Sequence, residues 1–339
     1  MHKKIYIFIF TLLNCSFAIG QDVILSQPYT ASQFLSPASV GGGVYQQRIQ
    51  GNMRSQMFEG ANLSNTIVVG WDTRIKRKVE DQYNYFGIGM HLISDKLAGG
   101  LLQTNHLTAN MAYHLFLDED NANEIALGLG ATFSQANIDK SKLIFNDSYD
   151  PYSGTYIGNS GDLLNLKPFP YKISANTGIM YTRQTTVNFL QVSANAFFYA
   201  TPDLAITNTN EATKFKAIAY LNYEQVFNES QTFMFHASYN NRVSSGTLSR
   251  QITAGGAVSF PLTYEWDQVK RLYVGCMYRA GEAIVPNISF MLNKYNLGLS
   301  YDVFMNNKSG AIIKQNGFEI SFSTSFGKRR NEFLKTIFD

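Results

Sequence analysis

One stretch of strictly alternating side chains constrains the fold more than any other feature of this chain. In residues 124–135, EIALGLGATFSQ, apolar residues alternate with small or polar ones. Successive side chains of a strand point to opposite faces, so Leu127 and Leu129 share one face and Gly128 and Gly130 the other. A soluble β-sandwich turns such an apolar face toward its core, whereas a membrane barrel turns it toward lipid. The number and length of such segments decide between the two folds.

The alternation recurs along most of the chain, in segments separated by turn residues. Fourteen segments fit a strand, at residues 44–56, 63–76, 83–94, 103–117, 123–136, 171–182, 186–199, 213–227, 231–242, 247–260, 269–280, 284–293, 294–305 and 315–327. A tilted strand crosses the hydrocarbon layer with about 9–11 residues, whereas strands of soluble proteins most often have about 5–6. The pattern therefore predicts an all-β protein, a transmembrane outer-membrane β-barrel of about 14 antiparallel strands closed by one chain.

Composition favours the same fold. Charged residues make up 16% of the chain, against about 25% in soluble domains, and the chain holds 25 Phe and 20 Tyr. A formal charge of +3, without basic runs between aromatic residues, gives no support for nucleic acid as a partner. No apolar run after the start is long enough for a spanning helix, so outer-membrane lipid would be crossed by a closed barrel.

The first 20 residues have the features of an export signal. Lys3 and Lys4 precede an apolar run, and Ala18-Ile19-Gly20 resembles a cleavage site. A lipoprotein signal at Cys15 is the alternative, and the apolar residues that continue beyond Cys15 argue against it. Cleavage would leave 26 − 25 = +1 formal charge and a single cysteine, so no internal disulfide. We expect export to the outer membrane of a Gram-negative cell.

The chain then divides into three parts. Residues 21–43, with two prolines and three consecutive glycines, predict an irregular N-terminal segment that forms a plug or a docking segment. Residues 44–327 would form the barrel, and residues 328–339 a basic C-terminal tail. A long break at residues 137–169 interrupts the strands, and loops of that length inside a compact domain are usually functional.

Short motifs occur along the mature chain in a characteristic order. They are Gln21-Asp22, Ser26-Gln27, Ser36-Pro37-Ala38 with Gly41, Arg48, Arg54 and Gln56 between two methionines, Gly87-Ile88-Gly89, Ala112-Tyr113-His114, Asp150-Pro151 and Gly317-Phe318-Glu319. This order resembles the PorP/SprF family of type IX secretion system outer-membrane proteins. The chain departs from the family pattern at Ser36, where members carry Asn, and at Met53 and Met57, where they carry aromatic residues.

The resemblance implies a role in protein secretion. Members serve the export or surface anchoring of proteins with type IX sorting domains, including adhesins of gliding motility, and some associate with other type IX secretion components. The partners it implies here are therefore a secreted surface adhesin, or subunits that link the machine to the outer membrane.

Two groups of residues are candidates for partner binding. Even-numbered polar residues of the first strand would face inward beside the N-terminal segment, and the long break holds acidic and aromatic side chains. The candidates are Arg48, Arg54 and Gln56 in the first group, and Asp147, Asp150 and Tyr152 in the second.

Nothing in the sequence indicates an enzyme. The mature histidines lack the spacing of a metal site, and no Gly-rich phosphate loop precedes a helix, so we expect no metal, no cofactor and no catalytic residue. His114 and His236 share the polar register of their strands and would face the lumen, where His236 and Ser238 would be solvated. A lipase using either histidine is the least favoured interpretation. Gly99 and Gly100 predict a turn of positive φ.

Two functions remain after these exclusions. The favoured one is a non-enzymatic barrel that works in type IX secretion by binding a secreted adhesin or machine subunits. The rival is a passive porin or hydrophobic-solute transporter, which would conduct ions or take up solute without any partner.

Overall fold

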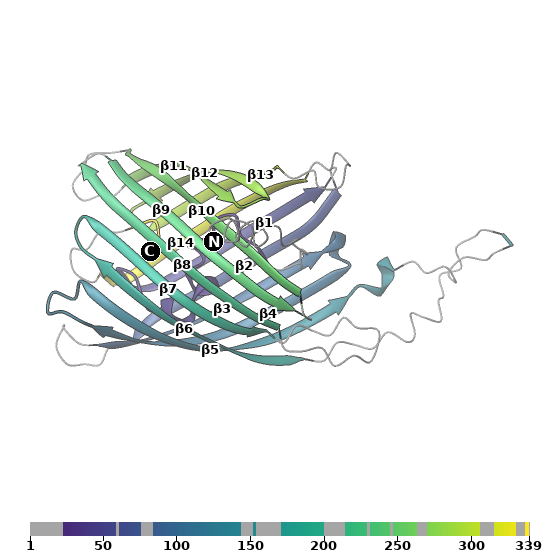
Figure 1. Ribbon diagram of the computed structural model, residues 1–339, viewed down its shortest axis with the longest axis horizontal. Coiled ribbons are helices and arrows are strands. Elements are labelled where there is room, and N and C mark those ends of the chain that lie inside the picture. Colours follow the sequence, from purple (N-terminus) through teal and green to yellow (C-terminus); the bar gives the residue numbers. More distant parts are fainter. Residues whose placement is uncertain are drawn as a thin grey trace, which may run out of the picture.

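The computed structural model is a closed barrel of fourteen antiparallel strands (Figure 1). It describes residues 23–58, 61–75, 84–143, 152–153, 171–199, 214–228, 231–244, 247–262, 270–305, 315–329 and 336–338. The strands are β1 (Tyr45–Phe58), β2 (Ala61–Ile75), β3 (Tyr85–Leu97), β4 (Leu102–Phe116), β5 (Asn123–Ile138), β6 (Lys172–Gln184), β7 (Asn188–Tyr199), β8 (Lys214–Asn228), β9 (Gln231–Ser244), β10 (Thr247–Pro261), β11 (Lys270–Arg279), β12 (Ala283–Leu292), β13 (Tyr295–Phe304) and β14 (Gln315–Arg329). The helical turns are η1 (Pro28–Thr30), α2 (Ser32–Leu35), η2 (Pro37–Ser39), η3 (Ala98–Gly100) and η4 (Lys140–Lys142).

Each strand pairs with its neighbours in sequence, and β14 pairs with β1 to close the ring. In the closing pair, Arg54 lies opposite Glu319 and Arg48 opposite Ser325. All fourteen predicted segments are strands, with ends within three residues of the prediction. The predicted fold class is confirmed. Closure removes the free edges that lipid could not satisfy with hydrogen bonds.

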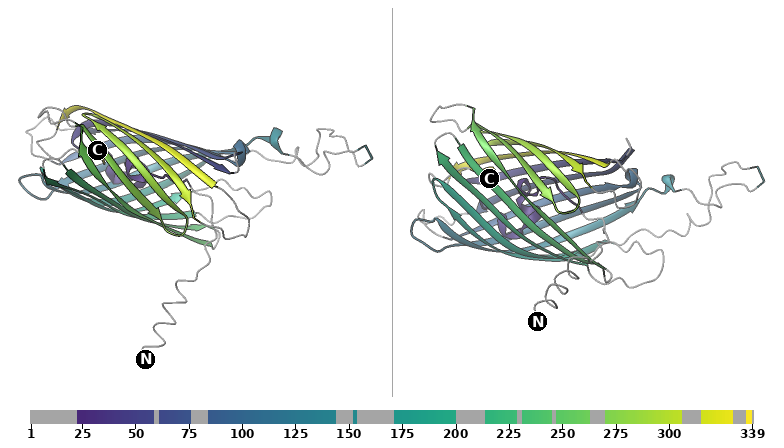
Figure 2. Two further views of the ribbon diagram at one scale, coloured as in Figure 1. Left: turned by 90° about the horizontal axis from the view of Figure 1, so that it is seen from above. Right: turned by 45° about the horizontal axis from the view of Figure 1, so that its top comes forward.

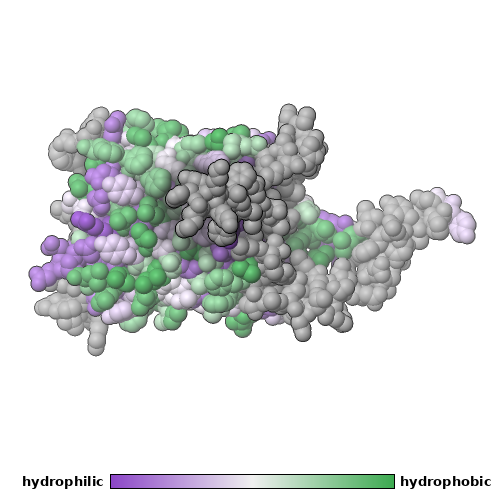
Figure 3. Space-filling model, in the orientation of Figure 1, coloured by the Kyte–Doolittle hydropathy of each residue, from purple (hydrophilic) through white to green (hydrophobic). Residues whose placement is uncertain are grey.

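The alternation separates an outer from an inner face. On β5, Leu127 is 57% and Leu129 60% exposed, whereas Ala126 and Ser134 are fully buried. Apolar side chains cover much of the visible outer wall, and hydrophilic residues gather at the end of the barrel on the left of the view (Figure 3). The outer face is therefore the one that suits lipid, and the small and polar face lines the lumen. Among the described residues, no helix is long and apolar enough to cross a membrane.

The two ends of the barrel differ. At one end, the terminal end, β1 begins and β14 ends, and short turns such as 117–122 and 293–294 join strands. There Asp118 accepts the backbone N–H of Asn123 at 3.0 Å, which fixes the predicted polar turn. The other end, the loop end, carries the connection 139–171 and the turn of η3, where Gly99 and Gly100 have φ of 65° and 86° as predicted.

Residues 23–44, the luminal segment, lie inside the ring of strands. Both views of Figure 2 show the short purple turns of η1, α2 and η2 within the barrel. Almost every residue from Leu25 to Gly41 is buried. The core of this protein is therefore the lumen, where the segment packs against inward side chains of strands from all around the ring.

Candidate functional site

The luminal segment folds into three short turns because its sequence prevents anything longer. Pro28 and Pro37 each start a turn at the position where a missing N–H costs nothing. Ser36 caps η2 by accepting the backbone N–H of Ala38. Such short turns leave most backbone groups without partners inside the segment, and buried backbone groups need them. The barrel wall supplies these partners at three places.

The first anchor is the carboxylate of Asp72 on β2. Arg48 pairs with it at 3.1 Å from Nε and 3.3 Å from Nη2. The same carboxylate accepts the backbone N–H of Gly41 at 2.8 Å and the side-chain amide of Gln33 at 3.4 Å. Arg48 also donates to the carbonyl of Ser39 at 3.1 Å. One buried ion pair thus ties the last residues of the luminal segment to β1 and β2.

The second anchor holds the beginning of the segment. Glu319 on β14 accepts the backbone N–H groups of Ser26 at 2.5 Å and Gln27 at 3.1 Å. The hydroxyl of Ser26 donates to Asp302 at 2.6 Å and accepts from Arg54 Nε at 3.1 Å. Arg54 Nη2 also pairs with Asp302 at 2.6 Å. The segment is therefore fastened to both strands that meet at the closure of the barrel.

Asp302 carries a second cation. Arg279 on β11 lies 3.2 Å from the carboxylate oxygen that Arg54 also contacts. Both arginines and the carboxylate are buried, and charges taken out of water are stable only when paired and hydrogen-bonded. The cluster has two cations around Asp302, and Glu319 lies opposite Arg54 in register. These opposite charges offset one another within the lumen.

The third anchor is His114 on β4. Its Nε2 lies 2.8 Å from the carbonyl of Val40, and its Nδ1 lies 2.6 Å from Glu124. A carbonyl only accepts, so Nε2 must donate, and the short contact at Nδ1 needs a further proton between ring and carboxylate. Tyr85 stacks on the ring at 4.3 Å and donates to Glu124 at 3.2 Å. Both side chains are buried, and the pair holds β4 and β5 against the segment near the terminal end of the barrel.

Glycines on the inner face give the segment its room. A Cβ at Gly128 would collide with the backbone of Pro37 and Ala38, and a Cβ at Gly87 would collide with the carbonyl of Val40. Gly128 is one of the small residues of the alternating stretch at residues 124–135. Its lack of a side chain permits the close approach of η2 to β5.

The end of the chain also enters the lumen. Residues Thr336, Ile337 and Phe338 are buried. Phe338 stacks on Phe189 at 5.5 Å and meets Tyr29 of the luminal segment edge-on at 5.7 Å. The backbone N–H of Ile337 donates to Glu224 at 3.1 Å. Phe338 therefore contributes to the packing inside the barrel.

Buried apolar side chains form two larger clusters inside the barrel. One cluster gathers around Leu25, Phe34 and Leu35, and the other around Tyr29 and Phe338. A recess whose lining includes Arg48, Glu124 and Phe338 measures about 20 Å³, room for about one water molecule. His236 was expected to be solvated, and this is wrong: it is fully buried, 5.5 Å from the ring of Tyr29.

The predicted partner-binding residues fall into separate places. Arg48 and Arg54 face inward, as their parity predicts, and both side chains are engaged in contacts that hold the luminal segment. Gln56 is half-buried and accepts a hydrogen bond from Arg54 at 3.5 Å. Tyr152 is 98% exposed. Asp147 and Asp150 lie outside the described residues, as does the predicted export signal at residues 1–20.

The sequence analysis missed the acidic half of this site. Asp72, Glu124, Asp302 and Glu319 are each the one carboxylate of their strand. A single carboxylate in a membrane-spanning strand is energetically costly unless it is paired. Its presence in the sequence therefore indicates a residue that needs a cationic or hydrogen-bonding partner. It identifies the residue but not its partner, because the partners lie up to 293 positions away.

In the described part of the chain, no group of three His, Cys, Asp or Glu side chains could hold a metal ion. The charged groups of the three anchors are buried, and the ion pairs described above are made with other residues of the same chain. Together these contacts bind the luminal segment inside the barrel.

Comparison with known proteins gives the barrel a context. Residues 18–324 match the family described as "Type IX secretion system membrane protein PorP/SprF". No curated protein matches the sequence. Among solved structures, the Pseudomonas putida toluene transporter TodX is similar with a TM-score of 0.50 and 10% identity, over 92% of this chain and 100% of that one. A TodX deltaS2S3 mutant monoaromatic hydrocarbon channel gives 0.52 and 10%, over 87% and 94%. At such identity the likeness concerns the fold alone.

Proposed function

This chain belongs to the PorP/SprF family of type IX secretion system membrane proteins, and from that premise we propose that it is a non-conducting outer-membrane scaffold that binds a secreted adhesin. The adhesin would carry a type IX sorting domain. Residues 1–20 would direct export and be removed. The chain would take part in secretion by holding a partner at the membrane, and it would catalyse no reaction.

The segment anchored inside the lumen is the observation that carries this proposal. Three buried anchors, at Asp72, Asp302 with Glu319, and His114, fasten the luminal segment from one end to the other. Phe338 packs against the same segment. A pore or a solute path needs a cavity along the barrel, whereas a scaffold needs a rigid body. The inner network favours the second.

The loop end is the surface that we propose meets the partner. In outer-membrane barrels the short turns face the periplasm and the longer loops face outward, and both chain ends of an even-stranded barrel lie on the periplasmic side. The connection 139–171 would then be extracellular. It carries Tyr152, which is 98% exposed, together with Asp147 and Asp150. Exposed aromatic and charged side chains on such a loop suit protein recognition.

Affinity capture from the native outer membrane tests the proposal. Both chain ends are unsuitable for a tag, because residues near them pack in the lumen. An epitope inserted between Glu119 and Asp120 uses an exposed turn of the terminal end instead. After cross-linking in intact cells, we expect a secreted surface protein with a sorting domain to co-purify. If periplasmic subunits of the secretion machine co-purify instead, the function would be to couple the machine to the membrane and not to anchor a secreted protein.

A pair of loop replacements makes the test specific. Replacing residues 144–170 by a short Gly-Ser turn should abolish capture of the secreted partner. Replacing residues 201–212, at the same end of the barrel, is the matched control and should leave capture intact. Capture that survives the first replacement, in a barrel that still folds, would contradict the assignment of this loop.

A hydrophobic-solute transporter is the second candidate, favoured by the similarity in fold to TodX alone. It predicts that liposomes containing the purified barrel take up a small aromatic hydrocarbon faster than empty liposomes do. Our proposal predicts equal uptake by both.

A further inference from the structure

A polar recess of about 480 Å³ lies at the loop end, where β2, β3, β4 and β5 meet η3 and η4. Its charged side chains are Lys96, Lys140, Lys142 and Asp139. None of these residues takes part in the anchors of the luminal segment. A volume of this size is within the usual range for sites that bind small organic molecules.

The recess is reached from the outer face of the barrel. Lys96 has the parity of Met90 and Leu92 on β3, which are 51% and 45% exposed. Asn137 has the parity of Leu129 on β5, which is 60% exposed. These side chains therefore project toward the side where the membrane lies.

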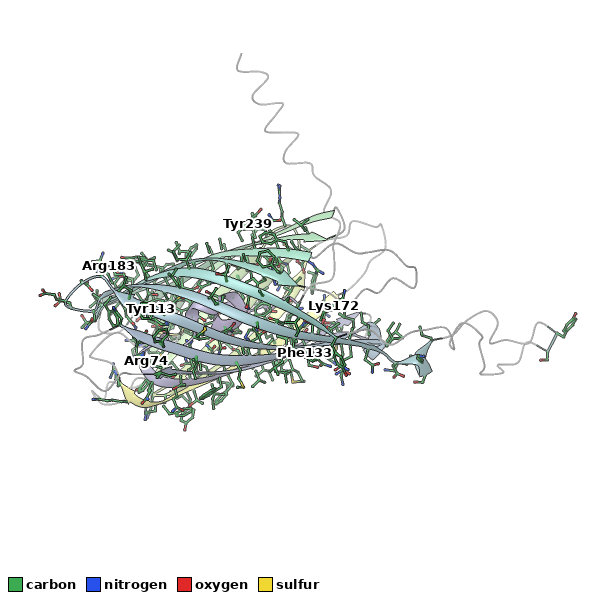
Figure 4. All side chains as sticks on the ribbon, turned by 90° about the horizontal axis from the view of Figure 1, so that it is seen from below. Arg74, Tyr113, Phe133, Lys172, Arg183 and Tyr239 are labelled. Carbon is green, nitrogen blue, oxygen red and sulfur yellow. The ribbon has the colours of Figure 1, made fainter. Side chains whose placement is uncertain are left out.

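Two outward rows of paired residues locate the recess relative to lipid. The apolar row is Val69, Leu92, Leu107 and Phe133, and the polar row is Asn65, Lys96, Gln103 and Asn137. On all four strands the polar residue stands four positions from the apolar one, or about 13 Å along the strand. Figure 4 shows Phe133 near the end of the barrel from which η4 extends, and Arg183 at the opposite end. The recess thus begins where the lipid-facing wall stops, at the level of head groups.

The described residues that line the recess carry a positive net charge. Three lysines face one carboxylate, and in the described part of the chain Lys96 forms no ion pair. Lys142 donates to the carbonyl of Gly99 at 2.8 Å and lies 3.8 Å from Asp139. The hydroxyl and backbone N–H of Ser141 donate to Asp139 and lower the pKa of that carboxyl. The carboxylate therefore stays charged at neutral pH, beside Lys142.

We propose that this recess binds the phosphorylated head group of an outer-leaflet glycolipid. The lysines would contact phosphate, the side chains of Gln103 and Asn137 would hydrogen-bond sugar hydroxyls, and the acyl chains would lie on the apolar row. Basic pockets at the membrane interface are suited to anionic head groups. A free anion would make the electrostatic contacts, but it has no acyl chains to pack against the apolar row. The proposal rests on the outer-membrane orientation given under the proposed function, and not on the partner.

Binding of lipid A, a bisphosphorylated glucosamine lipid, to the detergent-solubilised full-length protein tests the proposal. We compare the unchanged chain with K96A/K142A, with the charge-preserving K96R/K142R, and with Asp139→Asn. Arg183→Ala, at an exposed outward position of the opposite end, is the matched control. Native mass spectrometry counts bound lipid, and heat-modifiable gel mobility verifies that each barrel is folded.

The expected result follows from about fivefold in affinity per lysine near an anionic surface. K96A/K142A should bind roughly 25-fold more weakly, K96R/K142R should match the unchanged chain, and Asp139→Asn should bind tighter. Equal binding by K96A/K142A and Arg183→Ala would overturn the proposal. So would complete displacement of lipid A by millimolar inorganic phosphate, or equal retention of phosphatidylglycerol. Failure to capture a secreted partner with lipid A binding intact would refute only the proposed function.

Discussion

Removal of the Asp72 carboxylate gives a sharp test of how the lumen is closed. Asp72→Ala deprives four donors of their acceptor: two from Arg48, the backbone N–H of Gly41 and the side-chain amide of Gln33. The guanidinium of Arg48 would stay buried without its carboxylate. Breaking a buried ion pair by removing one partner costs roughly 3–5 kcal/mol. Because about 1.4 kcal/mol is tenfold in an equilibrium constant, the undocked population of the luminal segment should rise by roughly 100-fold or more.

Thiol labelling measures that population. Ser39→Cys places a near-isosteric thiol in the segment, where Ser39 is 2% exposed, and Cys276→Ser removes the exposed native thiol. When the segment closes faster than the reagent reacts, the labelling rate follows the open population. In this background, Asp72→Ala should speed labelling by roughly 100-fold. Asp118→Ala changes a carboxylate of the terminal-end turn and should leave the rate unchanged.

The paired variant distinguishes loss of the anchor from a general loosening. R48M/D72A removes both charges, so no ion remains buried and unpaired. Its labelling should be slower than that of Asp72→Ala alone, although the contact of Arg48 with Ser39 is also lost. Equal labelling of Asp72→Ala and Asp118→Ala would refute the reasoning, because the segment would then be held by something other than this ion pair.

Three further outcomes follow from the same packing. Gly128→Val should displace the luminal segment and make it sensitive to protease in the folded barrel. Ala131→Val, on the outer face of the same strand, should not. Equal protease resistance of the two variants would contradict the close approach of η2 to β5. Phe338→Ala should lower the free energy of unfolding in denaturant by about 3–5 kcal/mol, and a loss below about 1 kcal/mol would mean that the C-terminal residues do not pack in the lumen. Arg54→Lys should destabilise the barrel measurably, because an ammonium cannot reproduce the contact of Nη2 with Asp302 together with that of Nε with Ser26, and unchanged unfolding would contradict that role.

The strands were predictable because two different solvents act on their two faces. Lipid selects Leu127 and Leu129 on one side, and a crowded lumen selects Gly128 and Ser134 on the other. A shift of one residue would invert the whole strand, so the alternation determines the register of the outward face. Polar turns such as the one at Asp118 then separate successive strands.

The inner network was not predictable to the same degree. The sequence placed Arg48 and Arg54 on the inner face of the first strand, and the structure agrees. It gave no indication that Arg54 would meet Asp302, 248 positions away. Which strands lie across the lumen depends on closure of the ring, and closure is a property of all the strands together. His236 was misplaced in solvent for the same reason, because Tyr29 reaches it from a distant part of the chain.

Conductance of the purified barrel in a planar lipid bilayer tests the central claim most directly, that the chain closes its own lumen and works by binding. We predict no stepwise ion current for the unchanged chain, and clear steps for a variant that lacks residues 23–40. Steps of porin size from the unchanged chain would contradict the account, because they would require an open path beside the anchored segment.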